Sequence, residues 1–135
     1  ALHLEAVVLA ELAQAAAALG DCGRARVLAD EAVGVAQERH VMGVYSFLAR
    51  ALALRASDGA RAAAAIEADL RQAMAEVEQT EARAYVPLIH VERAELARLL
   101  GDETIYQREL REAHRLFVVM GATGHATRLA RELGI

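Results

Sequence analysis

Histidine and cysteine are the residue types in this chain best suited to metal binding or nucleophilic chemistry. The histidines are His3, His40, His90, His114 and His125. No two of them lie three or four residues apart, so the helical His-Glu-x-x-His zinc pattern is absent. We expect no metal site. His90 and His114 are expected to be partly buried or boundary residues of their hairpin, and His125 to be exposed in the first turn of the last helix.

The remaining reactive groups do not form a catalytic constellation either. Cys22 would need a histidine partner to act as a nucleophile, and the alternative, a turn residue at the solvent edge, is favoured. The sequence has no G-x-x-x-x-G-K-[ST] phosphate loop, so that route to ATP binding is excluded. Gly121 and Gly124 are interpreted as a helix stop and restart. We therefore expect no catalytic residue, no cofactor and no enzyme activity of this chain alone.

Most carboxylates are expected on solvated helix faces. Three pairs have the spacing of surface ion pairs, namely Glu67 with Arg71, Glu95 with Arg98, and Glu112 with Arg115. A small acidic patch, formed by Glu76, Glu78 and Glu81, could dock a basic partner, but a solvated helix end is the favoured interpretation.

The composition predicts an all-α fold. Alanine, the strongest helix former, makes up about a quarter of the chain. There is one proline, and aromatic residues are 4% of the total. The net charge of −4 and the calculated pI of 5.7 argue against nucleic acid as a partner.

The sequence also bears on the cellular location of the chain. No apolar run approaches the roughly 20 residues of a membrane helix, and no signal-peptide pattern occurs. One cysteine cannot form an internal disulfide. Together these features favour the cytoplasm, without contact with a membrane. The chain begins without methionine inside an amphipathic pattern, so we expect it to be part of a longer protein.

Glycine-containing turns divide the chain at regular intervals. Leu19-Gly20-Asp21, Ser57-Asp58-Gly59 and Leu100-Gly101-Asp102 each interrupt a helical pattern, with glycine closing one helix and aspartate capping the next. A recurrence of about 40 residues is typical of helical-hairpin arrays. The predicted helices are seven, at about 2–19, 22–39, 41–56, 59–79, 81–100, 103–120 and 124–133. Pro87 is expected either in the first turn of the fifth helix or at a kink within it.

Apolar residues at helical spacing predict which sides of three helices face the core. In the sixth helix they are Tyr106, Leu110, Ala113, Phe117 and Met120. In the second they are Ala25, Leu28, Ala29, Ala32, Val35 and Ala36. In the last, with Thr123 as the predicted N-cap, they are Ala126, Leu129, Ala130 and Leu133.

The first and third hairpins resemble tetratricopeptide repeats. In the first, Leu9, Leu12, Ala13 and Ala16 occupy the family's first-helix packing positions, and Ala25, Ala29 and Ala32 those of the second helix. In the third, the matching residues are Ala94, Ala97, Tyr106, Leu110 and Ala113. The family's aromatic residues are missing from the first repeat, and Arg93 stands where leucine is usual. The resemblance implies right-handed antiparallel hairpins at about 2–39, 41–79 and 81–120 with a capping helix at 124–133, in one domain.

The last third of the chain resembles a narrower group. The strings ERAELARLLGD and YQRELREAHRLFVVMGATGHATRLARELG are similar to the helical-repeat tails of large bacterial multidomain signalling ATPases. These proteins often have an adenylate/guanylate cyclase domain at the front, and related tails form the end of LuxR-type transcriptional regulators of the same ATPase class. The resemblance implies a sensor or scaffold role in such a protein and brings no catalytic residue to this chain.

The inner face of the array is the predicted binding site, because tetratricopeptide ligands usually lie against the first helices of successive hairpins. This face comprises Val7, Ala10, Gln14 and Ala17 in the first hairpin, and Leu88, Val91, Glu95 and Arg98 in the third. It suits an amphipathic helix supplied by the protein's own upstream domains or by another protein. The same residues could instead pack against upstream repeats. Exposed end faces also predict a homo-oligomer, and the alternative function is sensing a small molecule in an apolar pocket between helices.

Overall fold

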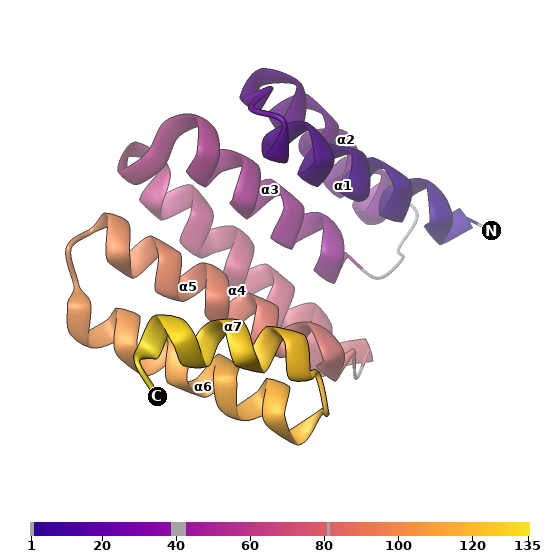
Figure 1. Cartoon of the computed structure of the whole chain (residues 1–135). Helices are drawn as coiled ribbons and strands as arrows, with labels where there is room; N and C mark the ends of the chain where they lie inside the picture. Colours follow the sequence, from indigo (N-terminus) through magenta and orange to yellow (C-terminus); the bar gives the residue numbers. More distant parts are fainter. Residues whose placement is uncertain (1, 39–42, 81) are drawn as a thin grey trace.

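The chain is all-α, as its composition predicts (Figure 1). The computed structural model describes residues 2–38, 43–80 and 82–135, and no strand occurs among them. The helices are α1 (Leu2–Ala18), α2 (Cys22–Glu38), α3 (Val44–Asp58), α4 (Ala63–Thr80), α5 (Val86–Leu99), α6 (Glu103–Val119) and α7 (Thr123–Leu133). Short 3₁₀ segments, η1 (Gly59–Ala62) and η2 (Arg83–Tyr85), precede α4 and α5.

The two Leu-Gly-Asp turns form as the sequence predicts. Gly20 and Gly101 have φ of 85° and 76°, a left-handed conformation that favours glycine. In both turns the N–H of the following aspartate donates to a carbonyl of the last helical turn at 2.9 Å. The carboxylates of Asp21 and Asp102 then accept from the N–H three residues later, at 3.1 and 3.0 Å. These bonds satisfy groups that helix ends leave unpaired, so each turn ends one helix and starts the next.

The Ser57-Asp58-Gly59 turn differs from the other two. α3 extends to Asp58, and Gly59 donates its N–H back to the carbonyl of Arg55. The Asp58 side chain makes no capping hydrogen bond, and the chain tightens into η1 instead of starting a new α-helix. The predicted α-helical start at 59 is therefore wrong, because α4 begins at Ala63.

Two other helix starts correct the prediction. The fifth helix was expected from 81, but α5 begins at Val86 after η2, and position 81 lies outside the described residues. Pro87 lies in the first turn of α5, where a missing N–H leaves no helical bond unmade, so the kink alternative is wrong. Thr123 is the first residue of α7 and not its cap, since Ala122 holds that position without a side-chain bond.

Consecutive helices pack in pairs, and each pair packs on the one before it. α1 pairs with α2, α3 with α4, and α5 with α6. α3 also contacts both α1 and α2, α5 contacts both α3 and α4, and α7 packs on α6. Figure 1 shows the result: α1 and α2 form one edge of the molecule, and α6 and α7 form the opposite edge. The odd-numbered helices α1, α3 and α5 follow one another along one side.

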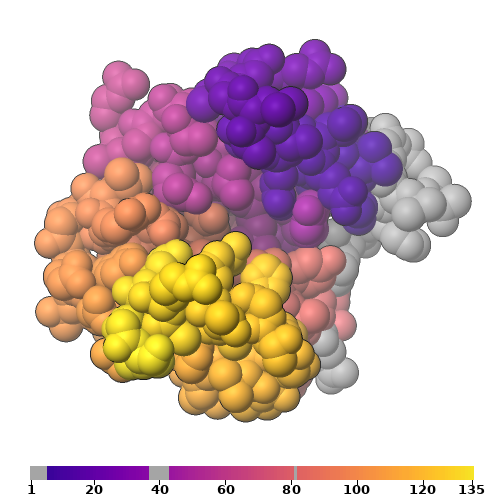
Figure 2. Space-filling view, viewed as in Figure 1, coloured from indigo at the N-terminus to yellow at the C-terminus, as the bar shows by residue number. Residues whose placement is uncertain are grey.

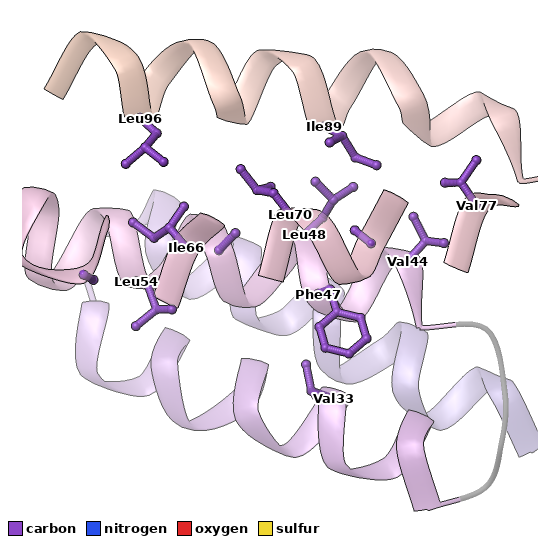
Figure 3. Packing of buried hydrophobic residues seen from close by; sticks show 13 residues of the cluster. Val33, Val44, Phe47, Leu48, Leu54, Ile66, Leu70, Val77, Ile89 and Leu96 are labelled. Atoms are coloured by element: carbon purple, nitrogen blue, oxygen red, sulfur yellow. The ribbon is translucent and has the colours of Figure 1, made fainter. Parts of the chain in front are cut away.

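The largest hydrophobic cluster lies at the centre and joins α2 to α5 (Figure 3). Its larger members are Val33, Val44, Phe47, Leu48, Leu54, Ile66, Leu70, Val77, Ile89 and Leu96. The buried residues of the cluster beneath α1 are all alanines, which lets α1, α2 and α3 approach closely. A third cluster joins α5, α6 and α7 through Ala94, Leu110, Ala113, Phe117, Ala126 and Leu129.

Burial confirms most of the predicted core and corrects part of it. Leu110, Ala113 and Phe117 are buried on α6, Ala25, Ala29, Ala32 and Ala36 on α2, and Ala126 and Leu129 on α7. Tyr106, Leu28, Val35, Ala130 and Leu133 are half-buried. Met120 is 46% exposed because α6 ends at Val119. Leu12, expected at a packing position, is 48% exposed, because Ala13 and Ala16 face the neighbouring helices in its place.

Candidate functional site

The structure separates the eight residues of the predicted inner face. Ala10 is fully buried in the alanine cluster, and Ala17 packs against that cluster. Val7 and Gln14 are half-buried on α1. Leu88 packs against both the central and the C-terminal cluster, which leaves it little surface for a partner. The other three residues line a cleft.

This cleft lies where α3, α5 and α7 meet and has a volume of about 300 Å³. We call it the odd-helix cleft. Its lining comprises Arg55 of α3, Val91, Glu92, Glu95 and Arg98 of α5, Leu110 of α6, and Arg128, Leu129 and Glu132 of α7. Leu110 and Leu129 are fully buried and provide an apolar base, while the charged residues surround it. In Figure 2, α7 (yellow) lies at the front near the lower edge of the molecule, and α1 (indigo) lies near the upper edge.

Two ion pairs hold charged groups of the cleft in place. Arg55 donates to both oxygens of Glu92, at 2.9 and 3.2 Å, and thereby ties α3 to α5. Burial disfavours the charge on Arg55, but the hydrogen bonds to Glu92 and the negative charges of Glu92 and Glu95 together outweigh it and raise the pKa of the guanidinium. One turn further along α5, Arg98 donates to Glu95, and this bond raises the pKa of Arg98. A bidentate arginine–carboxylate pair is directional, so the positions of the Arg55 and Glu92 side chains are well defined.

The charges contributed by α7 are less constrained. Arg128 is exposed and lies 3.4 Å from the ring Nδ1 of His125. Glu132 accepts from the hydroxyl of Tyr106 at 3.4 Å. Burial, and then the charge of Glu132, raise the pKa of Tyr106, so this hydroxyl stays protonated. Three arginines and three glutamates thus surround the apolar base without a net charge.

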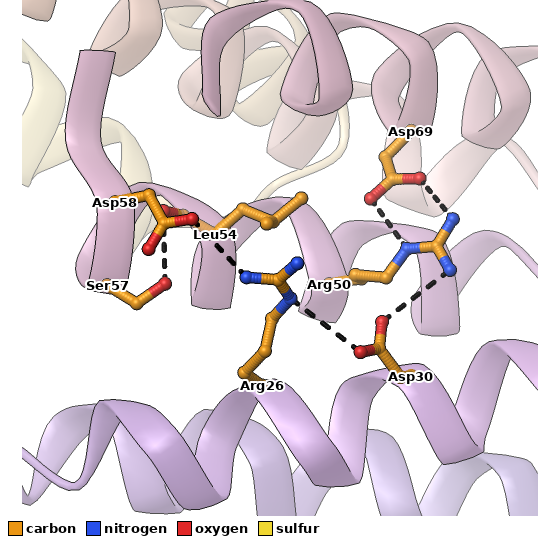
Figure 4. Close-up of polar contacts among 7 residues, drawn as sticks. All are labelled: Arg26, Asp30, Arg50, Leu54, Ser57, Asp58 and Asp69. Carbon is orange, nitrogen blue, oxygen red and sulfur yellow. Dashed lines mark hydrogen bonds and ion pairs between the residues drawn. The ribbon is translucent and has the colours of Figure 1, made fainter. Parts of the chain in front are cut away.

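A polar network between α2, α3 and α4 has a structural role. Arg50 of α3 donates to both oxygens of Asp69 on α4, at 2.9 and 2.7 Å, and lies 3.7 Å from Asp30 of α2 (Figure 4). Arg26 extends the network from Asp30 to Asp58. The hydrogen bond to Asp69 is the main cause of a raised pKa for Arg50. These contacts hold α3 in place against α2 and α4, and α3 in turn positions Arg55.

A second cleft, of about 340 Å³, lies between α4, α5 and α6. Its apolar lining is Leu96, Ala97, Leu100 and Ile105, and its charged lining is Glu67, Arg93, Asp102, Arg108 and Glu109. Arg93 and Glu67 are 4.0 Å apart across it, so the apolar part is bordered by an ion pair.

The histidines and the cysteine are separated in space. His90 contacts Glu109 through Nδ1 at 2.6 Å, which links α5 to α6. His114 is half-buried, and His125 is exposed in the first turn of α7, as predicted, with its ring stacked on Phe117. Cys22 is the first residue of α2, with Sγ 3.6 Å from the carbonyl oxygen of Ala56. The described residues contain no group of three or more potential metal ligands. His40, and the side chain of His3, lie outside the described residues.

The predicted surface features form in part. Glu95 pairs with Arg98, and Glu112 with Arg115 at 2.6 Å, whereas Glu67 lies against Arg93 instead of Arg71. In the acidic patch, Glu76 is half-buried and Glu78 exposed, and Glu81 lies outside the described residues. Gly121 ends α6 with φ of 74°, and Gly124 continues α7, so the stop-and-restart interpretation is confirmed.

Sequence reasoning missed the residues that α3 and α7 contribute to the odd-helix cleft: Arg55, Arg128 and Glu132. One signal in the sequence pointed to Arg55: it is a charged residue next to the apolar Leu54, on a helix that carries few charges. The partner of Arg55, however, is Glu92 on a later hairpin. No local pattern predicts a contact over that separation.

Comparison with known proteins assigns neither a family nor a function to this site. No protein-family model matches the chain, and neither curated proteins nor solved structures yield a match. Within the described part of the chain, every helix is too short or too polar to cross a membrane.

Proposed function

We propose that this chain is a tetratricopeptide-like helical-repeat module that binds a protein segment and so regulates a bacterial signalling protein. The repeat interpretation is supported by the two identical Leu-Gly-Asp turns and by the packing of α3 and of α5 on the pair of helices that precedes each of them. The resemblance of residues 90–135 to the tails of signalling ATPases suggests a cytoplasmic cyclase or LuxR-type regulator as its setting. The partner is a domain of the same protein or another protein.

The odd-helix cleft is the observation on which this proposal rests. It combines an apolar base with three arginines and three glutamates, of which Arg55 and Glu92 hold each other in place, and this combination suits a peptide segment with apolar and charged side chains. Arg98 and Arg128 are its exposed cations, and their guanidinium groups are available to a carboxylate of the partner. A strongly basic or acidic partner is disfavoured, because the cleft itself is balanced in charge.

A peptide-display selection against the immobilised chain tests this proposal. We expect enriched peptides to share a motif with an apolar residue flanked by charges, and to bind with micromolar affinity. Arg98→Glu and Arg128→Glu should each weaken binding about tenfold, equivalent to about 1.4 kcal/mol. Arg61→Glu is the matched control: this arginine is exposed on η1 and is not among the residues that line the cleft, and its replacement makes the same change of charge.

Two results would contradict the proposal. One is a selection that enriches no motif. The other is a set of peptides that bind the Arg98 and Arg128 variants as tightly as they bind the parent chain.

Small-molecule sensing is the second candidate, and the cleft between α4, α5 and α6 favours it. Its volume of about 340 Å³ and its lining of Leu96, Ala97, Leu100 and Ile105 are in the lower range for small-ligand sites. An apolar ligand bound there would raise the melting temperature of the chain, and Ile105→Glu would abolish that increase. A library of apolar compounds that causes no shift would argue against this function.

A further inference from the structure

The exposed side of α6 carries a row of three arginines. Arg108, Arg111 and Arg115 recur at steps of three and four residues and therefore share one side of the helix. The side chains of Arg108 and Arg115 are 68% and 61% exposed, and Arg111 is exposed as well. Val118, at the next step of three, and its neighbour Val119 are 56% and 74% exposed. We call these five residues the α6 outer row.

The fold does not require arginine at these positions. Counting forward from the equivalent turn glycines Gly20 and Gly101, the corresponding residues of α2 are Val27, Asp30 and Gly34, all of them exposed. An exposed row at the same steps on α4 comprises Ala68, Arg71, Ala75 and Glu78. Neither of these two rows has an excess of positive charge. The cationic character of the α6 outer row is therefore specific to this helix.

The carboxylates next to the row are already engaged by other groups. Glu109 contacts Nδ1 of His90 through one oxygen at 2.6 Å, and its other oxygen lies 3.4 Å from Arg108. Glu112 accepts two hydrogen bonds from Arg115. These contacts neutralise part of the charge of the row and leave the rest exposed to solvent.

Arg111 is the central arginine of the row, and it forms no ion pair with any described residue. It lies three and four residues from the other two arginines, and like charges at this spacing destabilise a helix. A cleft of about 420 Å³ beside it is lined by His90, Arg108, Glu109, Arg111, Glu112 and Arg115. Because both carboxylates of this cleft already have partners, a carboxylate from another molecule would meet guanidinium groups there.

The spacing of the row fits a partner helix. From Arg108 to Arg115 the row covers about 10 Å of helix axis, and a second helix with glutamates at the same steps places one carboxylate opposite each guanidinium. Val118 and Val119 extend the row by about one turn and would contact apolar residues of that helix. We propose that the α6 outer row is a docking surface for an acidic amphipathic helix of a protein partner.

An extended anionic surface fits the row less well than a single helix does. A membrane or a nucleic-acid duplex would also approach the first 80 residues, which carry 11 acidic and 7 basic residues. Their excess of negative charge repels such a surface, whereas a single helix contacts only α6. The α6 outer row shares no residue with the lining of the odd-helix cleft, so this inference does not rest on the proposed function.

Fluorescence anisotropy with a labelled peptide of about 15 residues, long enough to form a helix, tests the proposal. The peptide is alanine-rich, with glutamates at steps of three and four and a leucine on the same side at each end. We expect it to bind the chain in about 50 mM NaCl with a dissociation constant of about 10–100 µM, and about tenfold more weakly in about 500 mM NaCl. The same peptide with glutamine in place of glutamate should bind about tenfold more weakly than the glutamate peptide.

Variants of the chain test whether the peptide lies on the row. Arg108→Glu and Arg111→Glu should each weaken binding about tenfold, and Val118→Ser about threefold. Arg24→Glu is the matched control, because this arginine is exposed on α2 and the change of charge is the same. It should bind the peptide as the parent chain does, and so should Arg128→Glu, which alters the odd-helix cleft. Circular dichroism should show that all variants are folded.

The proposal fails if the glutamine peptide binds as tightly as the glutamate peptide, or if any of the three row variants binds like the parent chain. It also fails if Arg24→Glu or Arg128→Glu weakens binding as much as Arg111→Glu does, since the peptide would then respond to overall charge or lie in the odd-helix cleft. Vesicles of an anionic phospholipid and a labelled DNA duplex should not bind. Binding of either in place of the peptide would overturn the assignment of a protein partner.

Discussion

Replacing Asp69 by asparagine should destabilise the fold by about 2 kcal/mol. The Asp69 side chain is almost completely buried and accepts two hydrogen bonds from Arg50. Loss of one partner of a fully buried ion pair costs about 3–5 kcal/mol. Here the cost is smaller, because the amide oxygen keeps one hydrogen bond, and because Arg50 is 28% exposed and still lies 3.7 Å from Asp30. For a chain of this length, about 2 kcal/mol corresponds to a melting temperature about 7 °C lower.

Thermal and urea unfolding, followed by circular dichroism, measure this change. Asp30→Asn is the matched control, because the carboxylate of Asp30 is half-exposed and its pairs are long, so its loss should cost less than about 0.5 kcal/mol. The double variant Arg50→Met with Asp69→Leu should recover most of the stability, since it removes both charges together. An Asp69→Asn chain as stable as the parent, or a double variant less stable than Asp69→Asn alone, would refute the reasoning.

Three further outcomes follow from the described contacts. Glu92→Gln should lower the free energy of unfolding by about 1–2 kcal/mol and speed hydrogen exchange in α5, because it weakens a buried tie to α3; unchanged exchange would contradict this. Gly101→Ala should lower the free energy of unfolding by about 1 kcal/mol, because alanine is strained at the positive φ of this turn. Gly34→Ala, which lies in open space within α2, should raise it by about 0.5–1 kcal/mol. Urea unfolding compares the two variants, and equal effects would count against the turn argument. The hydrogen bond from Arg115 lowers the pKa of Glu112. The Glu112 carboxylate therefore stabilises the fold at pH values above its unfolded-state pKa, and this contribution is lost as the pH falls through the lowered pKa. NMR titration should show a higher Glu112 pKa in Arg115→Gln, and an unchanged pKa would mean that the bond is not formed.

Local signals predicted the helices well where the relevant bonds are local. The Leu-Gly-Asp turns are determined within a few residues by a left-handed glycine and a capping carboxylate, and both form as predicted. The Ser57-Asp58-Gly59 turn has similar residues, but Asp58 faces Arg26 of α2 and caps no helix. A tertiary contact thus overrode the local turn signal.

The candidate site was predicted only in part, for a related reason. Val91, Glu95 and Arg98 share one side of α5, and that relation is readable from helical spacing. Which other helices meet that side depends on how the hairpins pack on one another. Arg55 and Arg128 come from α3 and α7, and no spacing within α5 specifies them.

The sequence by itself determined the class of fold and the positions of the turns, because helix propensity, glycine conformation and capping act over a few residues. It did not determine which side of an alanine-rich helix faces inward. In α1 the alanines occur all around the helix, so periodicity does not separate buried Ala13 from exposed Leu12. Only packing against α2 and α3 decides that choice. The same packing leaves Val8, Leu12 and Leu19 exposed and brings the three odd-numbered helices α3, α5 and α7 around one cleft.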